Sequence, residues 1–184
     1  MDKIVTYGIN KIDKDHFKPI SNANSFDHRN KPYGGLWGSV YTPNNDIFMS
    51  DWVRFVYYDL PIERRSRYYV TYKLKSDTKL FTLDTLDDYL SMMDRYLYIP
   101  DGDFYDKFRI NFEKLSEDYD AIHVTKKAVT EMRMFLFNEI TTTLADFYHY
   151  DVDSYILFNL DCIDRKSIKS YTLPYEFGKD IEVY

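Results

Sequence analysis

Apolar residues alternate with polar ones in several short stretches of the chain, which is the period of a half-buried β-strand. Such stretches predict strands over 1–8, 34–41, 67–74, 79–83 and 120–124. The sequence Ser-Tyr-Ile-Leu-Phe within 153–159 is instead continuously apolar and bounded by polar residues, which predicts a strand buried on both faces.

Helical periodicity fills the stretches between the strands. Ser50 is a suitable N-cap for a short helix over 52–58, and Thr85 with Asp88 forms a capping box before a helix over 86–97. That second helix is expected to bury a stripe formed by Leu86, Leu90 and Met93.

Two further helices are predicted in the second half of the chain. One is expected to bury a stripe formed by Phe104, Phe108, Phe112 and Leu115. The other covers 128–147, although its β-branched residues at 140–143 weaken it. Polar loops are predicted at 10–33 and at the turn 43–46. Strands and helices in this mixture indicate an α+β fold.

Length and composition favour one domain over residues 1–184. The sequence lacks the ~18 consecutive apolar residues of a membrane span, and its start lacks a secretory pattern, so we expect a cytoplasmic protein with no membrane contact. Its 30 acidic residues exceed its 24 basic ones, giving a net charge of −6, which makes extended nucleic-acid binding unfavourable. Aromatic residues make up 18% of the chain, and packing in the core is the simplest role for them.

Motifs for metal and nucleophile chemistry are missing. A single cysteine, Cys162, forms no disulfide framework or CxxC site, and its position beside Asp120 and His123 in a possible nucleophile set has no local signature. We expect no metal site, because none of the four histidines has ligand spacing; these are His16, His28, His123 and His149. No Rossmann or P-loop glycine motif is present.

One local cluster combines basic and aromatic residues. Arg64, Arg65 and Arg67 precede Tyr68 and Tyr69, a combination that would bind a phosphate or a nucleic-acid strand. A solvated loop is the more frequent outcome for such a charge run.

Three segments that lie far apart in the chain are candidates for one shared binding site. The first strand ends in Thr6, Tyr7 and Gly8, and the late strand opens with Asp153 and Ser154. Between them lies the sequence Gly34-Gly35-Leu36-Trp37-Gly38-Ser39, a glycine turn that enters an aromatic strand. Each segment taken alone is explained by a turn or a strand end.

In their order and spacing the three segments resemble the ADP-ribosyltransferase superfamily, including its PARP-like and DarT-like branches, over about a third of the chain. The resemblance implies two small packed sheets flanked by helices, with NAD bound in a cleft between them. In that family the early strand ends His-Gly, the second motif has glycine followed by an aromatic and a small residue, and the late strand carries a catalytic glutamate.

The resemblance implies that the residues at the end of the first strand bind NAD. Gly8 would present its backbone to the nicotinamide amide, and Tyr7, preceded by Thr6, stands where a ribose-binding histidine is usual.

The glycine turn and the tryptophans receive roles in the same way. Gly34 and Gly35 would turn beneath NAD, Trp37 would stack on the nicotinamide ring, and Ser39 would bond to a ribose or phosphate oxygen. Trp52 would complete the aromatic wall, with burial in the core as the alternative.

The late strand departs from the family at its acid. Ser154 aligns with the usual glutamate, and Asp153 is the adjacent carboxylate that would stabilise the cationic sugar as nicotinamide leaves. Glu139 on the preceding helix is a remote substitute. The prediction requires Trp37 and Asp153 to converge on one dinucleotide-sized cavity.

The resemblance therefore implies a mono-ADP-ribosyltransferase that cleaves NAD and passes ADP-ribose to an acceptor, which is a protein, a nucleobase or a small molecule. A toxin, a defence factor or a counter-defence factor would be its natural setting. The alternative is an inactive module with the same fold that binds a nucleotide or a partner protein. A third reading, an acidic inhibitor of a basic partner surface, requires acidic residues clustered on one face.

Overall fold

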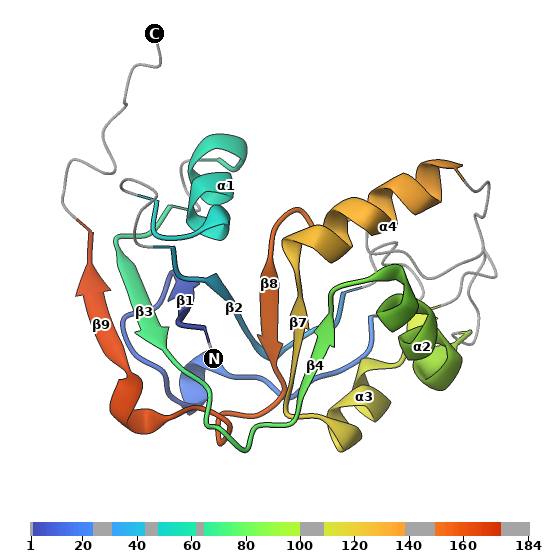
Figure 1. Ribbon diagram of the computed structural model, residues 1–184. Helices are drawn as coiled ribbons and strands as arrows, with labels where there is room; N and C mark the ends of the chain where they lie inside the picture. The colour runs from blue at the N-terminus through green and yellow to red at the C-terminus, as the bar shows by residue number, and fades with distance from the viewer. Residues whose placement is uncertain are drawn as a thin grey trace, which may run out of the picture.

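The computed structural model describes residues 2–23, 31–42, 48–61, 65–99, 109–138 and 150–173. Within these ranges the chain forms an α+β fold around a seven-stranded sheet (Figure 1). The strands are β1 (Ile4–Tyr7), β2 (Leu36–Val40), β3 (Tyr68–Tyr72), β4 (Leu80–Leu83), β7 (Ala121–Val124), β8 (Ser154–Leu157) and β9 (Lys169–Thr172), with β5 (Leu97–Tyr98) and β6 (Arg109–Ile110) as a separate pair. The helices are α1 (Asp51–Asp59), α2 (Leu86–Tyr96), α3 (Phe112–Asp118) and α4 (Lys126–Asn138), with short 3₁₀ turns η1 (Lys14–His16) and η3 (Arg165–Ser167).

The strands of the main sheet follow the order β4-β7-β8-β2-β1-β3-β9. Neighbouring strands are antiparallel except β4 and β7, which run parallel. The resemblance led us to expect two small packed sheets, and this is corrected: apart from the β5–β6 pair, the described strands join into one sheet, because β2 pairs with β8 on one side and with β1 on the other. The α+β class itself is as predicted.

Two groups of helices lie on the same face of this sheet and cover its two halves. Helices α2, α3 and α4 cover β4, β7 and β8 through a core that includes Leu83, Leu115 and Ile156, and α1 covers β1 through Val5 and its neighbours. In Figure 1, α1 and α4 stand on either side of β8. We call this the helix face. The opposite face carries a second core, around Tyr72, Tyr155 and Leu157, closed by non-helical segments.

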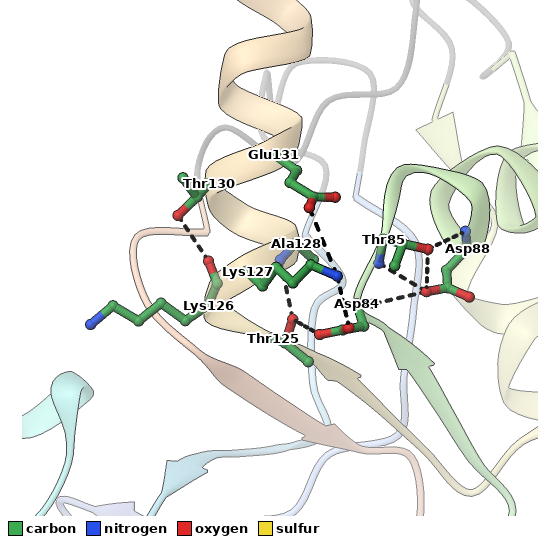
Figure 2. Close-up of polar contacts among 9 residues, drawn as sticks. All are labelled: Asp84, Thr85, Asp88, Thr125, Lys126, Lys127, Ala128, Thr130 and Glu131. Carbon is green, nitrogen blue, oxygen red and sulfur yellow. Dashed lines mark hydrogen bonds and ion pairs between the residues drawn. The ribbon is translucent and has the colours of Figure 1, made fainter.

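A polar network fixes the starts of α2 and α4 at the ends of the parallel strands β4 and β7 (Figure 2). The Thr125 hydroxyl donates to Asp84 at 2.8 Å and accepts from the Ala128 N–H, so it joins the two strand ends and caps α4. Lys127 adds an ion pair to Asp84 at 3.3 Å. The Thr125 hydrogen bond is the largest cause that lowers the pKa of Asp84 from its usual value, and Lys127 lowers it further.

The capping box predicted at the start of α2 is present. Thr85 accepts from the Asp88 N–H, and the Asp88 carboxylate accepts from the Thr85 N–H. Burial raises the pKa of Asp88, but hydrogen bonds from Thr85 and from the backbone of Asp84 and Thr85 outweigh it, so the net shift is downward. The predicted stripe is wrong at Leu90, whose side chain is 45% exposed. The buried face is formed by Tyr89, Met92, Met93 and Tyr96, because the large rings hide more apolar surface than Leu90 does.

The next predicted helix is also corrected. Arg109 and Ile110 form β6, which pairs with β5, and α3 begins only at Phe112 because Asn111 caps it through the Lys114 N–H. Phe112 and Leu115 are buried as expected, whereas Phe104 and Phe108 lie outside the described residues, as do the turn 43–46 and the predicted helical residues 139–147.

Candidate functional site

The three segments singled out in the sequence lie on three neighbouring strands. β1 ends with Thr6 and Tyr7, β2 follows the glycine turn, and β8 begins at Ser154, and the sheet order places them as β8-β2-β1. Trp37 pairs with Ile156 across β2 and β8, and the Thr6 hydroxyl donates to the Trp37 carbonyl at 2.8 Å. The backbones of the three segments are therefore adjacent in the centre of the sheet.

A row of hydroxyl side chains crosses the helix face from β8 to β3. Val5 pairs with Ser39 on one side and with Thr71 on the other. Continuing the β2–β8 register by one residue sets Ser39 opposite Ser154. Directly opposed residues project from the same face of a sheet, so these hydroxyls share the face that carries the helices.

The hydroxyls in this row differ in how they are satisfied. Ser39 is 1% exposed and Thr71 is 0% exposed, and neither hydroxyl has a hydrogen-bond partner within the described parts of the chain. Ser154 donates to the Val152 carbonyl at 2.9 Å. Native proteins pair nearly all buried polar groups, so two orphaned hydroxyls around one valine are unusual.

Aromatic side chains border this row. Trp37 is half-buried, its indole N–H donates to the Gly34 carbonyl at 3.0 Å, and its ring centroid lies 6.0 Å from that of Tyr150. The ammonium of Lys31 lies 5.8 Å from the Trp37 centroid. Trp52 on α1 is also half-buried and stacks on Phe55 at 5.6 Å.

The end of β1 is held against the segment that enters β3. Tyr7 is half-buried, and its hydroxyl accepts from the Ser66 N–H and donates to the Ser66 carbonyl. Thr6 projects from the opposite face of the sheet, where its hydroxyl lies 3.1 Å from that of Tyr72. Gly8 is exposed, has φ +96°, and donates its N–H to the Tyr68 carbonyl.

Gly34 and Gly35 serve contacts within the chain. Both have positive φ, and a Cβ on Gly34 would lie 2.1 Å from the Pro19 carbonyl oxygen. A Cβ on Gly35 would lie 2.9 Å from the Leu157 carbonyl oxygen. The close approach that we expected these glycines to offer NAD is made by the chain's own backbone.

Asp153 projects from the opposite face, away from Trp37. Its carboxylate lies 2.9 Å from His123 Nε2 and accepts from the Val40 N–H at 3.4 Å. The His123 ring stacks on Tyr155 at 3.9 Å, within the core of the opposite face. The expectation that Trp37 and Asp153 share one cavity is therefore corrected: the sheet lies between the two side chains.

Ser154, which aligns with the acid of the resembled family, does project from the helix face, but a serine hydroxyl carries no charge. Glu139, the substitute acid, lies outside the described residues, as does Arg64. The sequence alone did not predict the pairing of His123 with Asp153, because the pairing depends on the register of β7 and β8. In that register His123 stands opposite Tyr155. No local pattern in the sequence carries that register.

Within the described ranges, no cluster of three or more histidine, cysteine or acidic residues has the geometry to hold a metal ion. A helix of membrane-spanning length and hydropathy is also absent from those ranges. Comparison with models of protein families, with curated proteins and with solved structures gave no match.

Proposed function

We propose that the chain binds NAD or a closely related nucleotide on the helix face of β1, β2 and β8, and that it binds this ligand without cleaving it. The observation that carries the proposal is the grouping of Trp37 and Tyr7 with the unpaired hydroxyl of Ser39 on one face of neighbouring strands. An aromatic ring stacks on a nicotinamide or adenine ring, and a free hydroxyl bonds to a ribose oxygen. Because Ser39 is covered in the free chain, a ligand that reaches it has to displace its cover.

Binding without cleavage follows from the position of the carboxylate. Loss of nicotinamide creates a cationic sugar, which a carboxylate stabilises only if it lies beside the sugar. The Asp153 carboxylate projects from the opposite face of the sheet and pairs with His123. On the helix face Ser154 offers only a neutral hydroxyl.

Calorimetric titration of the purified chain with NAD tests the proposal, together with an assay of nicotinamide release. We expect saturable binding and no release. Trp37→Leu should weaken binding about tenfold, since a lost stacking contact of ~1.4 kcal/mol corresponds to that factor. Leu90→Ala, at an exposed position on α2, is the control and should bind as the parent does. An absence of heat at millimolar NAD refutes the proposal.

Mono-ADP-ribosyl transfer is the second candidate, and the adjacency of β1, β2 and β8 favours it. It requires an acid, which Glu139 or Asp153 would have to supply. Nicotinamide release that persists in Asp153→Ala and disappears in Glu139→Gln would establish cleavage of NAD and replace the binding-only proposal; ADP-ribose attached to an acceptor, and not released to water, would establish transfer. The acceptor would then be sought among proteins, nucleobases and small molecules.

A further inference from the structure

The guanidinium of Arg65 is held in one place by two elements of the fold. Its Nη2 donates to the Tyr57 carbonyl at 2.8 Å, and its central carbon lies 4.3 Å from the Tyr57 ring centroid. The next residue, Ser66, is clamped by the Tyr7 hydroxyl through both its N–H and its carbonyl. Arg65 is therefore positioned by α1 on one side and by β1 on the other.

No carboxylate balances this cation within the described residues. Lys126 and Lys127 form ion pairs with Asp51 and Asp84, whereas among the described residues Arg65 contacts Tyr57 and interacts with the nearby Tyr7 phenol. Its Nε is buried and meets no acceptor. A guanidinium has five N–H donors, and the described residues supply one acceptor, which leaves N–H groups for water or for an anion.

Two exposed residues lie on the strand ends that Tyr7 and Ser66 join. Gly8, next to Tyr7, is exposed, and among the described residues no atom lies within 4 Å of the position that a Cβ would occupy there. Tyr68, which accepts the Gly8 N–H through its carbonyl, is 46% exposed.

We propose that Arg65 binds a phosphate group, and that the phosphate belongs to the nucleotide of the proposed function. The planar fork of arginine matches phosphate oxygens, and rigid support lowers the cost of ordering it. Tyr7 links the two regions, because its ring shares the helix face with Trp37 while its hydroxyl anchors the segment that carries Arg65. The net charge of −6 is unfavourable for a long polyanion, so the ligand is a small phosphate ester. The identity of the phosphate's source rests on the proposed function, whereas the anion site does not.

Titration with inorganic pyrophosphate tests the anion site directly. We expect the parent chain to bind pyrophosphate and Arg65→Gln to lose at least tenfold in affinity, with Arg65→Lys between them because it keeps the charge but loses the fork. Arg54→Gln removes the same charge from an exposed position on α1 and is the matched control, expected within twofold of the parent. Failure of the parent chain to bind, equal binding by Arg65→Gln, or an equal loss in Arg54→Gln would each overturn the inference.

If Arg65 has only a structural role, Arg65→Gln should be less stable than the parent chain and should bind pyrophosphate with the same affinity. Circular dichroism and urea unfolding are therefore measured on every variant. If Arg65→Gln fails to fold, the Arg65→Lys titration decides: an affinity equal to that of the parent overturns the inference.

A second comparison separates this inference from the proposed function. Nicotinamide mononucleotide is titrated against nicotinamide riboside, which differs from it only by lacking the phosphate, and NAD is titrated beside them, in the parent chain and in Arg65→Gln. We expect the mononucleotide to bind more tightly than the riboside in the parent and about equally in the variant. Pyrophosphate binding through Arg65 without NAD binding would keep the anion site and refute the nucleotide. NAD binding with the same affinity in Arg65→Gln would keep the nucleotide site and show that Arg65 does not hold the phosphate of NAD.

Discussion

Replacing Ser39 by alanine should stabilise the free chain, which is an unusual expectation for a core position. The side chain is 1% exposed and its hydroxyl has no hydrogen-bond partner within the described residues. Folding therefore strips water from this hydroxyl and returns no hydrogen bond. Alanine removes the polar atom and keeps the Cβ, so the sheet needs no adjustment.

The magnitude follows from the two effects that oppose each other. An unsatisfied buried donor costs about 1–3 kcal/mol, and a void of one oxygen atom costs roughly 0.5 kcal/mol. We expect Ser39→Ala to raise the free energy of unfolding by about 1 kcal/mol, which corresponds to a rise of roughly 2–4 °C in Tm for a domain of this size. If the nucleotide bonds to Ser39, the same variant should bind it several-fold more weakly, since a hydrogen bond contributes ~1 kcal/mol.

Urea unfolding, followed by circular dichroism, measures the change, and Ser154→Ala is the matched control. Ser154 stands opposite Ser39 and is also buried, but its hydroxyl donates to the Val152 carbonyl, so its loss should cost about 0.5–1.5 kcal/mol. The two serines should thus shift the urea midpoint in opposite directions. A Ser39→Ala variant that is less stable than Ser154→Ala would refute the reasoning, because it would mean that the Ser39 hydroxyl is satisfied.

Three further predictions concern the frame of the site. Gly34→Ala should destabilise the chain by at least about 2 kcal/mol in urea unfolding, since its Cβ would lie 2.1 Å from a backbone oxygen at φ +76°; an unchanged midpoint would contradict this. The pKa of Asp84 is lowered in the folded chain, chiefly by the Thr125 hydroxyl, so its stabilisation is present above the unfolded pKa and disappears as pH falls through the folded value. Unfolding measured from pH 6 to pH 2 should therefore show a weaker pH dependence in Asp84→Asn than in the parent, and identical profiles would exclude this role. Asp153→Ala should lower the free energy of unfolding by about 1–3 kcal/mol, because it leaves His123 unpaired, and should not change the affinity for NAD. A variant that is as stable as the parent but binds NAD more weakly would show that Asp153 belongs to the binding site.

Local chemistry in the sequence was sufficient for most elements of the fold. The capping box of Thr85 and Asp88, the N-cap at Ser50 and the doubly buried strand at Ser154–Leu157 all depend on residues within a few positions of one another. The strand β9 was missed because its side chains are mostly exposed and show no alternation of burial. The helix expected across Arg109 was wrong because pairing with β5 outweighed the helical spacing of its apolar residues.

The candidate site was harder to predict, because it depends on which face each residue occupies. Trp37 and Ser39 share a face by their spacing of two, and this much is readable from the sequence. Asp153 precedes Ser154 by one residue, so it occupies the other face, and recognising its partner requires the pairing of β7 with β8. The glycine turn was noted correctly as a tight approach, but only the tertiary structure shows that the 18–20 segment and β8 occupy it.

The most direct test of nucleotide binding at β2 uses the chain's own fluorescence. The sequence contains two tryptophans, so Trp52→Phe leaves Trp37 as the sole indole reporter. Titrating this variant with NAD should quench the Trp37 emission to saturation, with the same affinity that calorimetry gives for the parent chain and with no nicotinamide released. An emission spectrum that stays unchanged while NAD binds would place the ligand elsewhere on the molecule and contradict the proposed site.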